Sequence, residues 1–485
     1  MVAFLYAASV LGMYAGFYEF GVMEKAPALA WRLVMLAGAA AVVYSDRTAI
    51  AFGSDISDTN RILMMALQSA LLWVLSVYFC FETRMEDVVG GPNPIARWQR
   101  IIDDAAAIEE EEDDKDKKKK PTPMKPKKEE LLKDKIVLIT GANAGIGKET
   151  ARQLAELGAS KIILACRSSK RGQEAVEDLR QHAQEQHDQK QQPKTVVASQ
   201  FIVLECDLGS FDSVRKAVDT LKDRQLKDIP QIDILILNAG VMMNELTFTK
   251  DKLETTMQAN LLGHFLLTRL LMEKKLMKPN KENPPRVLHL TSSTYMIALA
   301  SHGKMDFEDL MCDKNKRKYT LFGQYAQSKL GNILFAKELA RRYEGTLISL
   351  AIHPGIVRTD VTRNMPMYLK YPNQWLGGIV QQYQKSVAQG AWCTVAGAIL
   401  PVDASVRGSW EMDYMIMQEA AGEDTGEAEK KDDNNKITKG SMPNGSYLQN
   451  GRVRVSDPYT YEEPVCPRET NQKCLLPQDC LLVKA

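Results

Sequence analysis

Residues 140–147 read Thr-Gly-Ala-Asn-Ala-Gly-Ile-Gly and follow the apolar run Ile-Val-Leu-Ile at 136–139. This pattern predicts a strand that ends in a tight glycine turn and leads directly into a helix. In such a turn Gly141 permits the bend, Gly145 lets the backbone approach phosphates, and Gly147 lets the helix pack on the strand. Because the N–H groups at a helix start attract anions, the turn predicts a site for a dinucleotide pyrophosphate.

Short, continuous apolar runs recur at regular intervals after this turn, and helical stretches separate most of them. The predicted strands are 136–140, 161–166, 201–206, 232–238, 286–291 and 347–352. Continuous rather than alternating apolar strands are typical of a parallel sheet that is covered by helices on both faces. We therefore predict an α/β domain of the Rossmann type, with a doubly wound parallel sheet, over residues 135–418.

A second segment, Tyr325-Ala-Gln-Ser-Lys329, places a phenol and an ammonium group four residues apart. In a helix this spacing puts both groups on one face. A fixed cation favours the ionised phenol and lowers its pKa. A phenol of this kind can exchange a proton with a substrate oxygen, which the reduction of a carbonyl requires.

The second predicted strand ends in Ala165-Cys166-Arg167, and Lys170 and Arg171 follow closely. An acidic residue at this position would bond the ribose 2′-hydroxyl of NAD. A guanidinium group without an acidic neighbour suits the 2′-phosphate of NADP instead. We predict NADP(H) as the cofactor; the alternative is that these cations are ordinary surface residues at a helix start.

Between about residues 135 and 418 the chain resembles the short-chain dehydrogenase/reductase family, and within it the retinol-dehydrogenase-like branch. The motifs occur in the family's order: Thr140-Gly-x3-Gly-Ile-Gly147, Leu164-Ala-Cys-Arg167, Cys206-Asp-Leu208, Leu237-Asn-Ala-Gly240, Ala259-Asn-Leu-Leu-Gly-His-Phe265, Thr291-Ser-Ser293, Tyr325-x3-Lys329 and His353-Pro-Gly355. The resemblance does not extend to either end of the chain.

The resemblance implies a catalytic set of four residues. Tyr325 would be the general acid/base, and Lys329 would lower its pKa and hold the nicotinamide ribose. Ser293 would hydrogen-bond the substrate carbonyl, with Ser292 as the competing choice. Asn260 would keep a proton-relay water near Lys329. Hydride transfer from the cofactor creates an oxyanion that the phenol protonates.

The resemblance also implies which residues border the cofactor. Asp207 would bond the adenine edge, while Asn238 and Gly240 would lie beside the cofactor on the central strand. Pro354-Gly355 and Thr359 would flank the nicotinamide. The full cofactor set predicted is Gly141, Asn143, Gly145, Ile146, Gly147, Arg167, Asp207, Leu208, Asn238, Gly240, Tyr325, Lys329, Pro354, Gly355 and Thr359.

Apolar runs also occur before this domain, in a region that covers residues 1–101. Residues 2–22 are interrupted only by Glu19, residues 62–81 carry no charge, and the shorter run 28–44 carries Arg32. About twenty apolar residues span a bilayer, so we predict transmembrane helices near 2–22 and 62–81 and a third candidate at 28–44. A signal peptide is disfavoured because a basic start and a small-residue cleavage site are absent. For 28–44 an interfacial or buried helix is the alternative.

Charged and polar sequence flanks the predicted domain. Residues 102–134 contain an acidic block followed by Lys117-Lys-Lys-Lys120, which predicts a solvated linker, with contact to anionic lipid as the alternative. Residues 419–485 show no periodicity and are predicted to be a disordered tail. Cys466, Cys474 and Cys480 in this tail match no common zinc spacing, and no metal site is predicted.

The overall composition excludes one class of function. The 62 Lys and Arg residues nearly balance the 61 Asp and Glu residues, which gives a net charge of +1 and argues against nucleic-acid binding. Five of the eight cysteines lie in apolar contexts and are predicted to be reduced core residues. These five are Cys80, Cys166, Cys206, Cys312 and Cys393.

The predicted substrate is a lipophilic carbonyl compound or alcohol of the retinoid, sterol, polyprenoid or fatty aldehyde class. Residues 365–380, rich in Met and aromatic side chains, occupy the position of the family's substrate lid, with packing or a homodimer surface as alternatives. Because cells keep NADP largely reduced, carbonyl reduction is the predicted direction. We expect the domain in the cytosol on the endoplasmic reticulum membrane, and a glycan on the sequon Asn444-Gly-Ser446 would contradict that orientation. A membrane scaffold or redox-sensing protein with an idle NADP site is the alternative function.

Overall fold

The computed structural model describes residues 131–190, 200–223, 231–302, 304–314, 318–355, 357, 385–407, 442–449 and 452–454. The predicted membrane region, most of the predicted linker, the lid segment 365–380 and the tail cysteines lie outside these residues. Within the described ranges, no helix combines the length and the apolarity that crossing a bilayer requires. The three predicted spans all fall outside those ranges.

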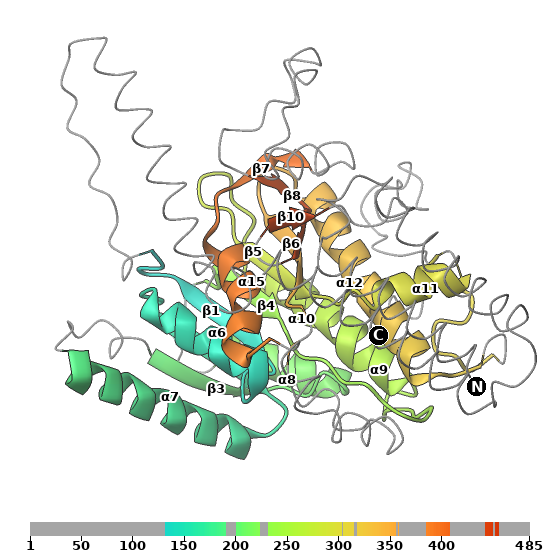
Figure 1. Ribbon diagram of the computed structural model, residues 1–485, viewed down its shortest axis with the longest axis horizontal. Coiled ribbons are helices and arrows are strands. Elements are labelled where there is room, and N and C mark those ends of the chain that lie inside the picture. Colours follow the sequence, from blue (N-terminus) through green and yellow to red (C-terminus); the bar gives the residue numbers. More distant parts are fainter. Residues whose placement is uncertain are drawn as a thin grey trace, which may run out of the picture. The chain divides into compact units, whose positions relative to one another are not determined.

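The core of the domain is a sheet with the strand order β10-β9-β6-β5-β4-β1-β2-β3, in which β9 is Tyr447–Gln449 and β10 is Arg452–Arg454. Figure 1 labels β6, β5, β4 and β1 of this sheet. The six predicted strands are present and pair in parallel, with ends within two residues of the predicted bounds. Their bounds are Ile136–Thr140 (β1), Lys161–Cys166 (β2), Gln200–Glu205 (β3), Ile234–Leu237 (β4), Arg286–Leu290 (β5) and Ile348–His353 (β6). The prediction of a parallel α/β sheet is confirmed.

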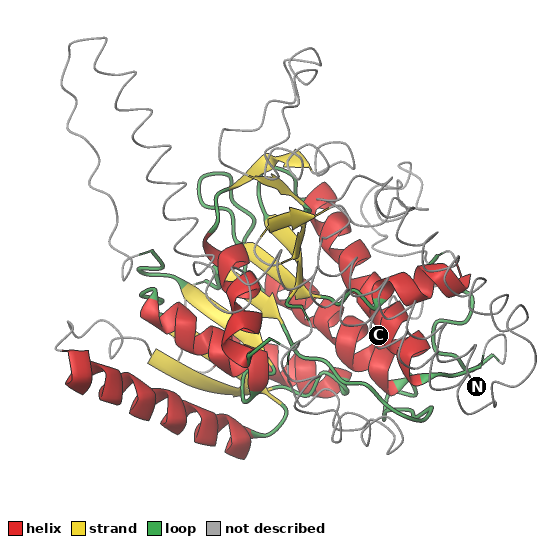
Figure 2. Cartoon of the chain, in the orientation of Figure 1, coloured by secondary structure: helices red, strands yellow, loops and turns green. Residues whose placement is uncertain are grey.

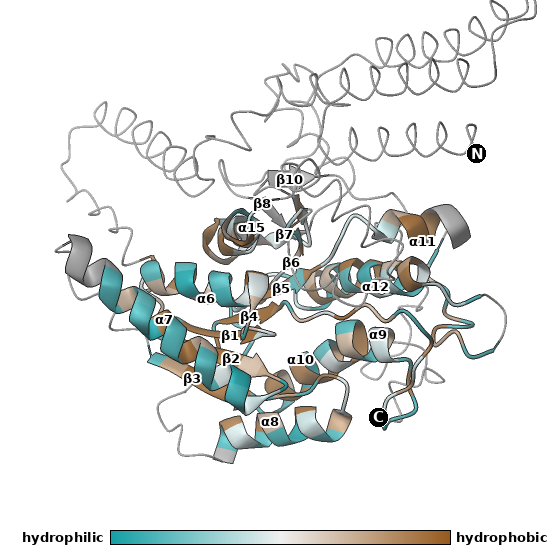
Figure 3. Cartoon of the chain, turned by 60° about the horizontal axis from the view of Figure 1, so that its bottom comes forward, coloured by the Kyte–Doolittle hydropathy of each residue, from teal (hydrophilic) through white to brown (hydrophobic). Residues whose placement is uncertain are grey.

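Helices cover both faces of the sheet, so the fold is doubly wound (Figure 2). One face packs against α6 (Gly145–Glu156), α7 (Ser169–Lys190) and α15 (Val387–Ile399). The other packs against α8 (Phe211–Asp223), α10 (Gly263–Glu273) and α12 (Leu321–Arg342). Shorter helical segments are α9 (Thr255–Met257), η4 (Gln258–Leu262) and α11 (Tyr295–His302). Figure 3 shows hydrophobic strands beneath a largely hydrophilic α7, as expected for a strand layer buried on both sides.

Parallel strands bring their carboxyl ends to one edge of the sheet. Thr140, Cys166 and His353 end β1, β2 and β6, and Asn238 and Thr291 directly follow β4 and β5. Ligands of open α/β sheets bind at this edge. The motifs that the sequence predicts to be functional therefore lie at the carboxyl-end edge of the sheet or on the helices beside it.

The prediction of a disordered tail was wrong for residues 442–449 and 452–454. β9 (Tyr447–Gln449) joins the sheet parallel to β6, and β10 (Arg452–Arg454) pairs antiparallel with β9. β8 (Met442–Asn444) forms a separate pair with β7 (Val402–Arg407). Strands of three residues show no periodicity, yet β9 completes its hydrogen bonds at the edge of β6 and the core buries its residues Tyr447 and Leu448. The predicted domain end at residue 418 therefore excludes strands that belong to the sheet.

The sequon asparagine is part of this packing. Asn444 is only 1% exposed; its Oδ1 accepts from the N–H of Ser349 at 2.7 Å, and its Nδ2 donates to the carbonyl of Leu347 at 2.6 Å. The side-chain amide thus imitates a strand pairing at the edge of β6. A glycan on Asn444 is incompatible with this arrangement.

Candidate active site

The glycine turn after β1 has the backbone geometry that the sequence predicts. Gly141 and Gly145 have positive φ angles of 65° and 56°, which favour glycine. A Cβ on Gly147 would lie 2.5 Å from Asn238 Nδ2 and 2.7 Å from the carbonyl oxygen of Gly141. The N-cap Ala144 makes no side-chain cap bond to α6, so the first-turn N–H groups are placed to receive an anion. Asn143 and Ile146 lie in the same turn, half-buried.

Asn238 and Thr140 hold this turn in shape. Asn238 Nδ2 donates to the carbonyl of Thr140 at 2.8 Å, and the backbone N–H of Asn238 donates to Thr140 Oγ1 at 2.9 Å. The N–H of Ala239 donates to the same hydroxyl oxygen at 3.0 Å. Asn238 was predicted to border the cofactor, and the structure shows that its side chain also fixes the turn.

The carboxyl end of β2 presents exposed cations. Arg167, Lys170 and Arg171 are all exposed there. Cys166 is buried, and burial raises the pKa of its thiol to about 11 against the opposing effect of the Ala142 and Asn143 N–H groups. The thiol therefore stays neutral. Cys166, Cys206, Cys312 and Cys393 are free and buried as predicted, while Cys80 lies outside the described residues.

Asn260 lies in the π-helical turn η4 and is fully buried. Its Oδ1 accepts from the N–H of Val241 at 2.7 Å, and its Nδ2 donates to the carbonyl of Val241 at 2.9 Å. The same Nδ2 donates to Ser328 Oγ at 3.0 Å. The side-chain amide thus joins Val241, in the segment after β4, to Ser328 on α12, the helix that carries Tyr325.

Tyr325 and Lys329 lie on α12, which begins at the N-cap Thr320. Lys329 Nζ is 5.4 Å from the centre of the Tyr325 ring and donates to the carbonyl of Leu290 at 3.0 Å. A Cβ on Gly240 would lie 3.5 Å from Lys329 Nζ and 3.6 Å from Asn260 Oδ1. Glycine at 240 therefore leaves a space between two of the predicted catalytic residues, and a larger side chain would enter it.

Burial controls the protonation of this pair. It raises the pKa of Tyr325 above its ordinary value and lowers the pKa of Lys329 to about 8, because the charged form of each group loses its hydration. The sequence-based expectation was a lowered pKa for Tyr325. The structure gives the opposite direction, because burial of the phenolate removes its hydration.

The serine motif follows β5 and faces the same helix. Thr291 Oγ1 donates to the carbonyl of Lys329 at 2.8 Å, which ties the end of β5 to α12. Ser292 Oγ accepts from the N–H of Thr294 at 3.3 Å and so serves its own turn. Ser293, the serine predicted to bond the substrate carbonyl, is the next residue of the same turn and is half-buried.

The other described residues of the predicted cofactor set lie around the same edge. Asp207 Oδ1 accepts from the N–H of Gly209 at 3.0 Å, and the Leu208 side chain lies in the core, so only the Leu208 backbone is available to a ligand. Gly355 has φ +87°, and a Cβ there would meet Lys385 Nζ at 2.8 Å. The Nζ of Lys385 also lies 3.5 Å from the Pro354 carbonyl oxygen. Sequence reasoning missed this lysine because it belongs to no motif. Thr359 lies outside the described residues.

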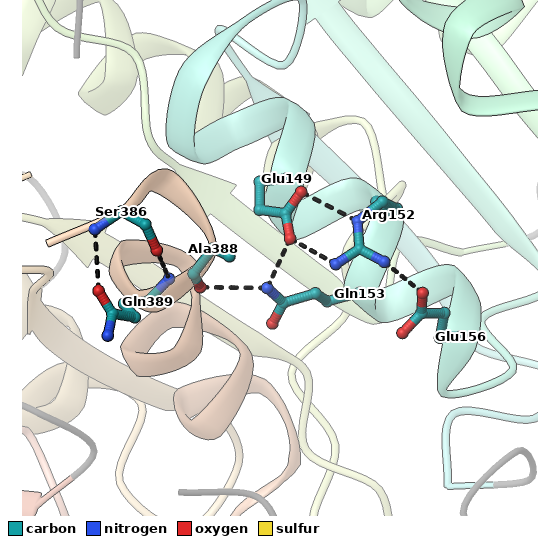
Figure 4. A network of polar contacts seen from close by, with 7 residues as sticks. All are labelled: Glu149, Arg152, Gln153, Glu156, Ser386, Ala388 and Gln389. Atoms are coloured by element: carbon teal, nitrogen blue, oxygen red, sulfur yellow. Dashed lines mark hydrogen bonds and ion pairs between the residues drawn. The ribbon is translucent and has the colours of Figure 1, made fainter. Parts of the chain in front are cut away.

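A polar network fastens α15 to α6, the helix that starts at the glycine turn (Figure 4). Gln153 Nε2 donates to the carbonyl of Ala388 at 3.1 Å and to Glu149 Oε1 at 2.8 Å. Burial alone would raise the pKa of Glu149, but hydrogen bonds from Arg152 and Gln153 lower it below its ordinary value. Ser386 and Gln389 form a capping box at the start of α15. The capping box stabilises the start of α15, the first described helix after the predicted lid segment 365–380.

Parts of this chain are similar in sequence to known proteins. Residues 135–295 match the family described as short chain dehydrogenase. Retinol dehydrogenase 12 of Mus musculus is 38% identical over 258 residues, which cover 53% of this chain and 71% of that protein. Retinol dehydrogenase 14 of Homo sapiens is 38% identical over 243 residues, 50% of this chain and 67% of that protein. A short chain dehydrogenase structure from Shigella flexneri, complexed with NADP, is 20% identical, with 55% of this chain and 93% of that chain covered and a TM-score of 0.38.

Proposed function

The chain belongs to the short-chain dehydrogenase family, and on that premise we propose that it transfers hydride between NADP(H) and a lipophilic carbonyl compound or alcohol. The observation that supports this most is the meeting of Lys329, Asn260 and Gly240 at one point, with Tyr325 one helical turn before Lys329. The glycine turn suits the dinucleotide, because the missing side chain at Gly147 lets the start of α6 pack against Asn238 and Gly141, and helix starts bind anions through their N–H groups.

The residues of the chain have distinct chemical tasks in this proposal. A bound nicotinamide supplies or accepts the hydride. Tyr325 gives its phenolic proton to the substrate oxygen during reduction, and Ser293 hydrogen-bonds the same oxygen. Lys329 is buried beside the phenol and holds the ribose with its ammonium group. Asn260 holds the segment around Val241 against α12 through hydrogen bonds of its side-chain amide.

The substrate is proposed to be a retinoid, sterol, polyprenoid or fatty aldehyde. Relatives bearing the name retinol dehydrogenase support this class, as do the three apolar runs before the domain, which would hold the enzyme at a membrane. We place the protein in the endoplasmic reticulum membrane with its catalytic domain in the cytosol. Carbonyl reduction with NADPH is the proposed direction. The membrane and a homodimer partner are the proposed associations.

Turnover by the full-length protein in detergent or nanodiscs tests this function. We expect NADPH oxidation with all-trans-retinal, a sterol ketone, a polyprenal or a long-chain aldehyde, and much slower oxidation with a small water-soluble aldehyde. NADPH binding without turnover on any of these carbonyls would favour a scaffold or redox-sensing role instead.

Cofactor preference should depend on Arg167. Replacement by alanine removes a guanidinium group that suits the 2′-phosphate, and a charge-assisted bond contributes roughly 1.5–3 kcal/mol, or about 10- to 100-fold in affinity. We expect Arg167→Ala to raise the Kd for NADPH by that factor and to leave the Kd for NADH nearly unchanged.

Arg180→Ala is the matched control, because it removes the same charge from an exposed position on α7, thirteen residues after Arg167. Fluorescence titration of both cofactors measures the effect. An unchanged NADPH-to-NADH ratio in Arg167→Ala would reject the proposed phosphate contact.

A further inference from the structure

His264 is a buried titratable residue to which the proposed chemistry assigns no role. It lies near the start of α10, one turn after Asn260, and is 1% exposed. Its Nδ1 lies 2.9 Å from the carbonyl oxygen of Asn260, and its Nε2 lies 2.8 Å from Thr140 Oγ1. The imidazole therefore bridges the predicted relay residue and the residue that begins the glycine turn.

The two contacts allow only one arrangement of protons. A carbonyl oxygen can only accept, so Nδ1 carries the hydrogen and donates to Asn260. Burial lowers the pKa of His264 to about 4, so the ring is neutral and Nε2 is an acceptor. Thr140 must then donate its hydroxyl hydrogen to Nε2, and its oxygen is left to accept from the N–H groups of Asn238 and Ala239.

The bonds form one directed chain across the site. It begins at the backbone after β4, passes through the Thr140 hydroxyl and the His264 ring, and ends at the Asn260 carbonyl. The alternative acceptor for the hydroxyl is the carbonyl of Ile236, which is farther away at 3.4 Å. The short contact to Nε2 is the better bond.

The carbonyl at the end of this chain lies in a special turn. In η4 the N–H of Gly263 bonds to the carbonyl of Gln258, five residues back. π turns interrupt the regular pairing of a helix and are frequent at functional sites. Both Nδ2 hydrogens of Asn260 are already used by Val241 and Ser328, so the backbone carbonyl is the remaining Asn260 group whose direction a neighbour can set.

We propose that His264 is a positioning residue that aims the Asn260 carbonyl and couples it to the glycine turn through Thr140. This role rests on the proposed function, because it serves the relay water that Asn260 is expected to hold. The proposal also explains why a polar ring occupies a fully packed position, where an unpaired nitrogen would be costly.

Two substitutions separate the contacts of the ring. The amide nitrogen of asparagine occupies the place of Nδ1, so His264→Asn can keep the bond to Asn260 and loses the bond to Thr140. The amide oxygen of glutamine reaches the place of Nε2, so His264→Gln can keep the bond to Thr140 and loses the bond to Asn260. His264→Phe keeps the ring volume and loses both bonds.

We expect kcat to fall about 10- to 100-fold in His264→Gln and His264→Phe, and less than about fivefold in His264→Asn, with KM little changed. A residue that only fills space would give the opposite order, because asparagine leaves the largest cavity. Thermal melting of the same variants shows the packing order independently. A kcat order that follows the melting order would overturn the proposal.

Hydrogen exchange of the peptide covering residues 256–266 provides a readout that does not need turnover. We expect faster exchange in His264→Gln and His264→Phe than in His264→Asn. If the wild-type protein turns over none of the carbonyls, the proposed function fails, and the exchange order alone then decides the role of His264. Equal exchange in all three variants would reject it.

Discussion

Tyr325→Phe should reduce kcat by about 1000-fold while the Kd for NADPH changes less than about threefold. General acid–base catalysis by a positioned side chain contributes roughly 10²- to 10⁴-fold. The substitution removes only the hydroxyl group of a side chain that is 9% exposed on α12, so the fold and the cofactor turn remain intact. Stopped assays of NADPH oxidation and fluorescence titration of the cofactor measure the two effects.

Tyr343→Phe is the control, since Tyr343 is the C-cap residue of the same helix and lies far along it from Tyr325. It should leave kcat within about twofold of the wild type. Retention of a tenth or more of the activity by Tyr325→Phe would show that another group supplies the proton, and the assignment of the acid/base to this phenol would be wrong.

The parallel sheet could be predicted because its strands are buried on both faces and read as continuous apolar runs. β9 could not, since three residues are too few for a pattern. A usable signal was nevertheless present: Asn450-Gly451 joins Gln449 to Arg452, and this dipeptide favours a tight two-residue hairpin between antiparallel strands. Sequence reasoning passed over it because the surrounding tail is polar.

The motifs predicted which residues gather at the sheet edge but not how they bond. The latch between Asn260 and Val241 joins a helix to a loop, and its register depends on packing that the sequence pattern does not encode. The contact of His264 with Thr140 links residues that are 124 positions apart. Similarly, the raised pKa of Tyr325 follows from burial, whereas spacing alone reveals only its charged neighbour.

Lys329→Met should abolish turnover and yet stabilise the folded protein at neutral pH. The pKa of Lys329 falls from 10.5 to about 8 on burial, so holding the ammonium in the core at pH 7 costs roughly 3 kcal/mol. Methionine loses the bond to the Leu290 carbonyl, which contributes about 1 kcal/mol, but Asn332 Nδ2 still donates to that carbonyl at 3.0 Å. A net gain of about 2 kcal/mol remains, or several degrees in Tm.

The pH dependence of this gain identifies its cause. Between pH 8 and 10.5 the folded wild-type protein binds fewer protons at Lys329 than the unfolded chain does, so its stability rises with pH through that window. The Tm advantage of Lys329→Met should therefore be largest at pH 7 and disappear near pH 10.5.

Lys216→Met, at an exposed position on α8, should show no advantage at any pH. A Tm difference that does not change with pH would mean that packing, and not the buried charge, separates the two proteins. In that case the buried ammonium of Lys329 does not lower the stability of the fold. Its role would then lie only in binding the cofactor and in assisting proton transfer by Tyr325.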